Sequence, residues 1–411
     1  MPRQLRGGII VTKNKPEESL SKNFMALLSE GIPVQVVGSI PSVIFLWIIL
    51  QYTKSAIMGS FYGDLSELGI LLMIPISLFI SRTSGKRRLY LMAHFSMLLS
   101  GAIVLLVMLT GDRVLELAAI FIMGFVVSVM GLFYRSINQF WSREFLKRGE
   151  YQKGSSYYMV IFSASYIASY ALAGILTYIN YYFSLAIYIV GVLLSILLIF
   201  RIHPESENYE PPERRSFRKS YSEIIKNRSM KEYLIFIFFV NCIGAPLMLV
   251  ILELVMTRFS NSSFALTIIL TVGMAGGLFG SFLSSKIKKG NIKNFMIISL
   301  IPVALTMFIL TFLSQYILVT IDLFFYILFF SFHSPFSENL EYKIADQKQV
   351  VQLYSIRDTL RIIAYIVFLT IGGFLIEFVG LDYALYMSTL LAVISILIIY
   401  ASKDLAKYTV Q

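Results

Sequence analysis

The sequence predicts an all-α membrane protein whose twelve transmembrane helices form two pseudo-symmetric bundles of six. Three observations support this fold class. Of the 411 residues, 57% are hydrophobic and only 14% are charged, whereas soluble domains are about 45–50% apolar and about 25% charged. Twelve apolar runs reach the length of about 20 residues that crosses a bilayer as a helix. Basic residues are concentrated in alternate loops between these runs.

The twelve runs are delimited by the change from apolar to polar residues along the chain. They lie at 24–52, 56–80, 89–110, 114–139, 155–178, 181–201, 233–257, 262–284, 294–315, 316–337, 356–378 and 381–402. In the first run, Pro33, Gly38 and Pro41 predict a kink. In the seventh, Pro246 frees a backbone carbonyl and, with Gly244, allows a bend.

The basic residues indicate which loops face the cytoplasm. Of 35 lysines and arginines, the loops expected outside the cell contain only Lys54, Arg113 and Arg258. Because cytoplasmic loops are rich in Lys and Arg, we expect a multi-pass protein of the cell (plasma) membrane with both termini in the cytoplasm. The net charge of +11 is then a topology signal that requires no nucleic-acid partner. The basic face can also attract the headgroups of anionic membrane lipids.

A long polar segment divides the chain into two related halves. We expect a cytoplasmic segment (1–23), a six-helix bundle (24–201), a cytoplasmic linker (202–232) in which 216–232 can form a surface helix, a second six-helix bundle (233–402) and a cytoplasmic tail (403–411). The segments SYIASYALAGIL and AYIVFLTIGGFL align, which matches Tyr166 to Tyr365 and Gly174 to Gly373. Internal duplication of this kind is typical of transporters.

The basic loop after the second run carries a family motif. The chain resembles the major facilitator superfamily, whose loop motif has the form G-x-x-x-D-R-x-G-R-[RK]. The segment SLFISRTSGKRR supplies Arg82, Gly85, Lys86 and Arg87 in the order of the motif, but it has Ser77 for the glycine and Ser81 for the aspartate. The resemblance implies that these basic residues belong to a cytoplasmic gate. Arg357, Asp358 and Arg361, at the start of the eleventh run, are read as part of that gate or as a surface ion-pair cluster.

Within this superfamily the chain is most similar to the macrolide-efflux and siderophore-export group. The segments KGSSYY, IIKNRSMKEYLIFIFFVN and LQYTKSAIMG carry this similarity, although the fifth run lacks the proline of other drug antiporters. The resemblance implies a monomer whose first, fourth, seventh and tenth helices line a central cavity, with parts of the second, fifth, eighth and eleventh. Polar residues facing that cavity are functional candidates.

Asp64 and Glu67 form the most unusual feature of the apolar runs. They lie one helical turn apart, roughly 12 and 17 Å from the outer start of the second run. Two lipid-facing carboxylates would cost roughly 5–7 kcal/mol, so they must face the cavity, pair with a base or be protonated. We expect a coupled acid pair that gains and loses protons during transport. The alternative is a structural hydrogen-bond network with neighbouring serines or a distant basic residue.

The fourth run places small and polar residues on one helical face. Gly124, Ser128, Gly131, Arg135 and Asn138 recur at intervals of three or four, which allows close helix packing or leaves space for a substrate. Arg135 faces the cavity or extends to the cytoplasmic headgroups. In the eighth run, two rows of small residues that include Gly276 and Gly280 predict helix packing instead of a binding site.

The remaining candidates each have a structural alternative. Glu30 is a proton-coupling candidate, or a solvated residue if its helix starts later. Asp322 and His333 lie eleven residues apart and share a helical face, which suits a proton path, or they are an interfacial acid and a buried histidine. Asn241 is a substrate candidate. Glu253 is another, or an acid in water at the outer boundary.

These observations predict a secondary active transporter, proton-coupled and exporting an amphipathic organic compound. A proton-coupled or facilitative importer, and a lipid or siderophore transporter on the same fold, are the alternatives. An enzyme is not expected, because the sequence lacks HExxH, GxSxG and phosphate-binding motifs. We expect no cofactor apart from the coupling proton, and no metal site, since the three histidines are far apart and Cys242 is the single cysteine.

Overall fold

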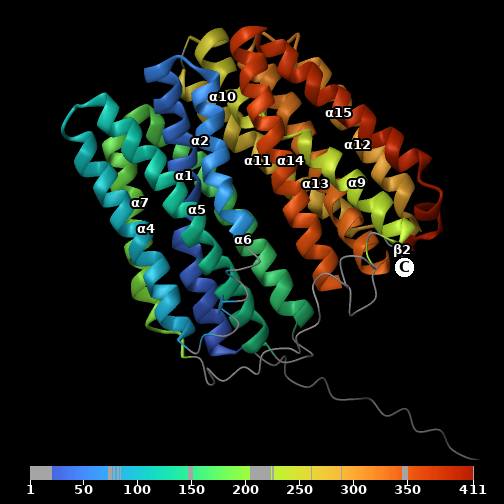
Figure 1. The fold of residues 1–411 in the computed structure, drawn as a ribbon, viewed down its shortest axis with the longest axis horizontal. Coiled ribbons are helices and arrows are strands. Elements are labelled where there is room, and N and C mark those ends of the chain that lie inside the picture. Colours follow the sequence, from blue (N-terminus) through green and yellow to red (C-terminus); the bar gives the residue numbers. More distant parts are fainter. Residues whose placement is uncertain are drawn as a thin grey trace, which may run out of the picture.

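The structure is a computed structural model that describes residues 21–72, 76, 79–80, 83, 85–146, 151–203, 224, 226–260, 262–287, 289–344 and 350–410. Its long helices lie side by side in two halves, coloured blue to green and yellow to red (Figure 1). Most of the expected segments 1–23 and 202–232, and Arg82 of the loop motif, lie outside the described residues.

The helices coincide with the predicted runs in order and place, with differences at several ends. The N-terminal half contains α1 (Lys22–Thr53), α2 (Ala56–Leu68), η1 (Gly69–Leu72), α4 (Lys86–Met108), α5 (Arg113–Glu144), α6 (Tyr151–Ile179) and α7 (Tyr181–Ile199). The C-terminal half contains α9 (Arg228–Cys242), α10 (Leu247–Arg258), α11 (Ser263–Ser285), α12 (Ile292–Leu310), α13 (Tyr316–Ile344), α14 (Val350–Phe378) and α15 (Leu381–Ala401). A short 3-10 turn, η2 (Asp404–Lys407), and an antiparallel pair of β1 (Gly290–Asn291) with β2 (Thr409–Val410) complete the described elements.

Eleven helical segments in the described part of the chain are long and apolar enough to cross a membrane, with α9 and α10 counted as one. The remaining predicted run, the second (56–80), begins as α2, which ends at Leu68 and continues as the 3-10 turn η1. At this change a Cβ on Gly69 would lie only 2.6 Å from the Ser128 carbonyl carbon. The glycine therefore lets this segment cross α5 closely.

The two ends of the bundle are named here by their connections. At the linker end, α1 begins beside the end of α7, where the Asn23 Nδ2 donates to the His203 carbonyl at 2.6 Å. At the turn end, α1 connects to α2 through Lys54, whose φ of 54° is left-handed. The prolines act as predicted in the seventh run, where Pro246 separates α9 from α10. By contrast, α1 continues without interruption past Pro33 and Pro41.

The glycines of α11 pack this helix against α13, as predicted. A Cβ on Gly276 would lie 2.3 Å from the Phe324 carbonyl oxygen, and one on Gly280 would lie 2.0 Å from that of Leu328. The two helix backbones are thus in direct contact at these two levels. Small residues allow this approach within a membrane, where close packing is a main source of helix association.

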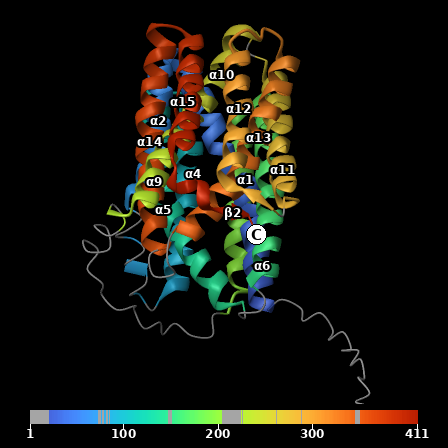
Figure 2. The same ribbon diagram turned by 90° about the vertical axis from the view of Figure 1, so that its right-hand side faces the viewer.

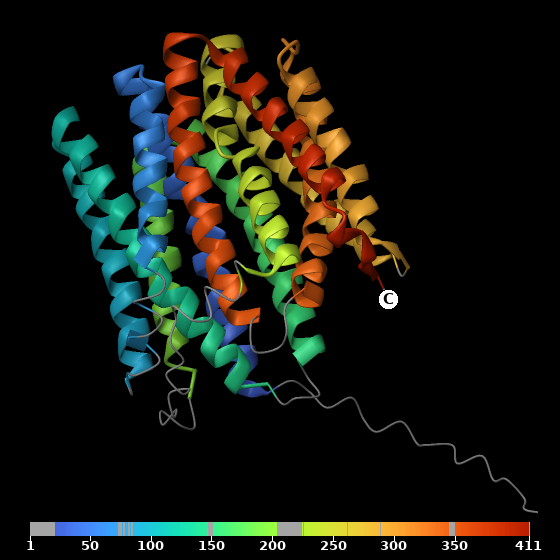
Figure 3. The ribbon, with the colours of Figure 1, turned by 45° about the vertical axis from the view of Figure 1, so that its right-hand side comes forward.

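The two halves meet at two equivalent pairs of helices. Next to α11, α6 brings Gly174 so close that a Cβ there would lie 2.6 Å from the Thr267 Cα. Beside α2, α14 brings Gly373 so close that a Cβ there would lie 2.5 Å from the Ser60 Oγ. Figure 3 shows the blue α2 next to the orange-red α14, and Figure 2 shows the two helix pairs on different sides of the molecule. The duplicated glycines therefore serve duplicated interfaces, both toward the turn end.

Candidate functional site

Asp64 lies on the interface between the halves. Its side chain is 7% exposed, and its Oδ2 accepts a hydrogen bond of 2.5 Å from the Thr370 hydroxyl of α14. The other carboxyl oxygen, Oδ1, is buried without a hydrogen-bond partner among the described residues. This acid thus faces the opposite half of the protein.

Glu67, one turn deeper toward the linker end, faces a different environment. It is half-buried, and it lies within electrostatic range of two guanidinium groups, those of Arg135 on α5 and Arg361 on α14. In the described part of the chain it forms no hydrogen bond or ion pair within 4 Å. The two acids of α2 therefore have different partners, Thr370 for one and two arginines for the other.

One tyrosine lies near both acids and also near a tyrosine of the other half. Tyr365 of α14 lies within electrostatic range of Asp64 and Glu67, and also of Tyr166 on α6. The Tyr166 hydroxyl is 3.0 Å from that of Tyr170. Tyr166 and Tyr365 are the residues that the sequence duplication matches, so the repeat places equivalent tyrosines near each other across the interface.

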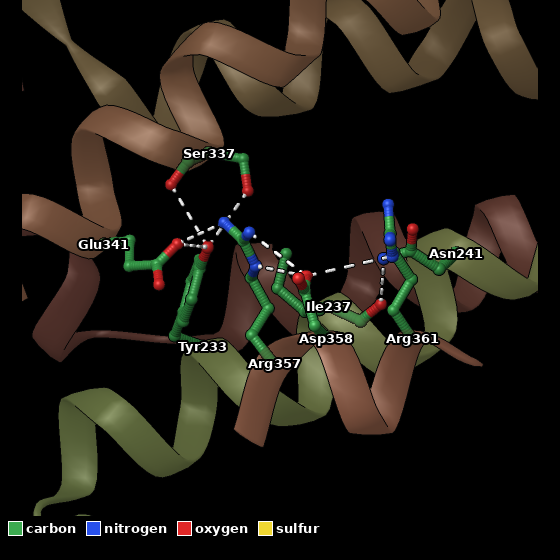
Figure 4. Close-up of polar contacts among 8 residues, drawn as sticks. All are labelled: Tyr233, Ile237, Asn241, Ser337, Glu341, Arg357, Asp358 and Arg361. Atoms are coloured by element: carbon green, nitrogen blue, oxygen red, sulfur yellow. Dashed lines mark hydrogen bonds and ion pairs between the residues drawn. The ribbon is translucent and has the colours of Figure 1, made fainter. Parts of the chain in front are cut away.

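A cluster of charged residues occupies the linker-end half of α14. Figure 4 shows Arg357 between Glu341 and Asp358. The Arg357 Nη1 is paired with Glu341, and its Nη2 is 3.2 Å from the Asp358 Oδ1. Arg361 is farther from the same oxygen, at 3.9 Å, and its side chain is 47% exposed. All four residues belong to the C-terminal half, so the contacts described here stabilise that half internally.

Glu377 of α14 was not singled out by the sequence. Its Oε2 accepts hydrogen bonds from the Ser55 Oγ at 2.6 Å and from the Ile57 backbone N–H at 2.9 Å. An acid at the N-terminus of α2 satisfies an unpaired amide and complements the helix dipole. This contact joins the halves at the turn end. The sequence gives little indication of this contact, because most acids near the end of a membrane helix are simply solvated.

A comparison with known protein families shows which family the chain belongs to. Residues 37–360 match the model of the Major Facilitator Superfamily. The chain belongs to that family. Its members are transporters and not enzymes, so this major facilitator protein is a multi-pass transporter.

Solved structures share the fold of this major facilitator protein at low sequence identity. A bacterial homologue of the iron transporter ferroportin is 11% identical, with a TM-score of 0.76 over 95% of this chain and 100% of that one. A D-xylose–proton symporter is 13% identical, with a TM-score of 0.67 over 92% and 96%. The human organic anion transporter MFSD10 is 11% identical, with a TM-score of 0.63 over 92% and 98%. No curated protein matches the sequence.

Glu30, the candidate in α1, is fully buried within the N-terminal half. Its Oε1 lies 2.9 Å from the His94 Nε2 and accepts from the Ser195 hydroxyl, and its Oε2 accepts from the Tyr90 hydroxyl at 2.6 Å. The His94 Nδ1 is 2.9 Å from the Tyr90 carbonyl, which can only accept. Nδ1 is therefore the donor in this contact, and Nε2 faces the Glu30 carboxyl group. Four helices, α1, α4, α5 and α7, surround this network.

Two candidates of α5 lie in packing contacts inside the same half. The Asn138 Nδ2 donates to the Tyr90 hydroxyl at 3.4 Å, and Asn138 is 1% exposed. The Ser128 Oγ accepts from the Gly69 backbone N–H at 3.0 Å. On the same face, a Cβ on Gly124 would lie 2.8 Å from the Tyr62 ring. This face of α5 therefore packs on α2 and α4 over most of its length, and Arg135 is its exposed member.

The C-terminal candidates do not form one group. Asp322 is 7% exposed and its Oδ2 has no hydrogen-bond partner among the described residues. His333 is buried, with its Nδ1 3.2 Å from the Ser299 Oγ. The Asn241 Nδ2 donates to the Ile237 carbonyl at 2.7 Å in its own helix. Glu253 is half-buried and within electrostatic range of Lys54 and Glu377 at the turn end.

The described residues of the family's loop motif contact their own half. Gly85 is the N-cap of α4. The Lys86 Nζ donates to the Thr83 carbonyl at 3.1 Å and lies 4.6 Å from the centre of the Phe140 ring. The Arg87 guanidinium lies over the Phe200 ring. Across the described residues, no group of three or more His, Cys, Asp or Glu side chains could hold a metal ion.

Proposed function

We propose that this protein is a proton-coupled secondary active transporter that exports an amphipathic organic compound by alternating access. The observation that carries this proposal is the placement of Asp64 on the interface between the halves, with Thr370 of the opposite half as its hydrogen-bond donor. A buried carboxylate with an unpartnered oxygen is costly while it is charged. Protonation removes that cost.

Alternating access would connect this protonation to transport. When the halves separate at the turn end, Asp64 loses Thr370 and gains water, so its preferred protonation state changes with the conformation. Glu67 is the second acid on the same helix face and shares the tyrosine neighbour Tyr365. The two acids would then respond to opening of the turn end as a coupled pair.

Export, in preference to import, is supported by the similarity of sequence segments to the macrolide-efflux and siderophore-export group. One solved structure with this fold is a D-xylose–proton symporter, so the same architecture is compatible with import. We place the linker end and both termini in the cytoplasm of a cell (plasma) membrane, because the lysines and arginines gather there. We propose a monomer surrounded by membrane lipids, with small molecules as the other partners.

The experiment is concentrative transport by purified protein in liposomes. A panel of amphipathic compounds is screened for thermal stabilisation, because binding to the native state raises its apparent stability. The compound with the largest shift is then tested under an imposed pH gradient. We expect accumulation on the side with more protons, by exchange, and no accumulation when the gradient is collapsed. Accumulation on the opposite side identifies a symporter, and movement independent of the gradient contradicts proton coupling.

A further inference from the structure

Two arginines from opposite halves approach the same carboxylate. Arg135 projects from α5 and Arg361 from α14, and both side chains are exposed. Glu67 lies within electrostatic range of both guanidinium groups. Since α5 and α14 belong to different halves, this acid is a shared counter-ion of the two halves.

Neither guanidinium is held in a close ion pair in the described part of the chain. Arg361 is 3.9 Å from the Asp358 Oδ1, an oxygen that also binds Arg357 at 3.2 Å. Arg135 has no ion pair within 4 Å among the described residues, and its electrostatic partners are Glu67, Tyr134 and Tyr158. An arginine presents five donors and binds carboxylates or phosphates in a bidentate manner. Among the described residues, most of this capacity is unused at both arginines.

The helix geometry places both arginines on the linker side of Glu67. Arg361 precedes Thr370 by nine residues, roughly 13 Å along α14, whereas Glu67 follows Asp64, the partner of Thr370, by only one turn. On α5, Ser128 lies at the level of Gly69, whose backbone N–H donates to its Oγ. Arg135 follows Ser128 by seven residues, which places it roughly 10 Å closer to the linker end. A molecule entering from the linker end would therefore meet the arginines before the acids.

Aromatic side chains flank this region in both halves. In the N-terminal half, the rings of Tyr158 and Phe162 stack at 4.0 Å, and Tyr158 lies within electrostatic range of Arg135. In the C-terminal half, the ring of Phe368 is 6.3 Å from that of Phe238, and Tyr365 is one turn from Arg361. Cations next to aromatic faces suit a ligand with an apolar body and a negative group.

We propose that Arg135 and Arg361 together bind the anionic group of the transported compound, which replaces Glu67 as their counter-ion. The substrate class is thus an amphipathic organic anion that carries a carboxylate, sulfonate or phosphate. This inference rests on the proposed transport function and specifies its substrate. Because the arginines belong to different halves, an anion bound to both would also connect the halves on the linker side of Glu67.

The test compares three matched probes with the purified full-length protein: 2-naphthylacetate, its neutral amide 2-naphthylacetamide and the cation 2-(2-naphthyl)ethylamine. Equilibrium dialysis in detergent gives each dissociation constant without any pH gradient. We expect the wild type to bind the anion at least ~10-fold more tightly than the amide, since a charge-assisted contact is worth about that much or more. Equal or tighter binding of the amide or the amine overturns the proposal with no variant needed.

Variants then locate the preference. Arg135→Gln and Arg361→Gln should each weaken binding of the anion about 10-fold and leave the amide unchanged. Glu67→Gln should strengthen binding of the anion, because it removes the competing carboxylate. Arg88→Gln, an exposed arginine at the start of α4, is the matched control and should change nothing. An anion preference that persists in the double arginine variant contradicts the assignment, and because no gradient is used, this result is independent of proton coupling.

Discussion

The Thr370 hydroxyl donates a 2.5 Å hydrogen bond to Asp64, and this contact crosses from the C-terminal half to the N-terminal half. Glu377 makes a second crossing contact two turns away at the start of α2. Both contacts join α14 to α2 at the turn end. Under the proposed alternating access, opening of that end would break both contacts, and each of them has a carboxylate as its acceptor.

A cross-link between α2 and α14 should stop transport. A Cβ on Gly63 would lie 3.7 Å from the Leu369 Cγ, which places cysteines at these two sites within reach of a disulfide. In a Cys242→Ser background, oxidation of Gly63→Cys with Leu369→Cys should abolish transport in liposomes, and reduction should restore it. The single-cysteine variants treated with the same oxidant are the controls. Full transport by the cross-linked protein would show that these helices need not separate.

The duplicated glycines of the interface should resist even a methyl group. In Gly174→Ala, the new Cβ would lie 2.6 Å from the backbone of Thr267, and such overpacking costs about 1–3 kcal/mol. We expect a lower unfolding temperature in detergent for this variant, and for Gly373→Ala. Gly38→Ala is the matched control, because nothing lies within 4 Å of its Cβ. An unchanged or raised stability in Gly174→Ala would contradict the close approach of α6 to α11.

Glu30 and His94 should stabilise the N-terminal half as a pair. Removing one side chain from this buried network leaves its polar partners unsatisfied, which costs about 1–3 kcal/mol, so Glu30→Gln and His94→Gln should each lower the unfolding temperature. The double variant should lose less than the sum of the two, with a coupling energy of about 0.5–3 kcal/mol. The half-exposed pair Arg258 and Asp382 provides the control cycle, with coupling of about 0–1 kcal/mol. Strict additivity for Glu30 and His94 would show that the two side chains do not interact.

The fold was largely predictable because it follows from local composition. Eleven of the apolar runs correspond to helical segments long enough to cross a membrane, and the small residues of α11 indicated close helix packing without identifying α13 as the partner. The ends were less predictable: α13 continues to Ile344 and α14 begins at Val350, since polar residues extend these helices beyond the apolar runs used to find them.

The candidate site was only partly predictable because it depends on contacts between distant helices. Asp64 and Glu67 were found as carboxylates in apolar surroundings, which is a local signal. Their partners, Thr370, Arg135 and Arg361, come from other helices, and no sequence pattern pairs them. His94 illustrates the same limit, because its relation to Glu30 appears only when α1 and α4 pack together.

The most direct measurement of the central claim compares two kinds of transport by Asp64→Asn in liposomes. Exchange of labelled for unlabelled substrate needs the conformational cycle alone, whereas accumulation under a pH gradient needs proton coupling. We predict that this variant keeps exchange and loses accumulation, while the control Asp404→Asn, a half-exposed partner of Arg228, keeps both. Accumulation by Asp64→Asn at the wild-type level would contradict the assignment of Asp64 as a proton-coupling residue.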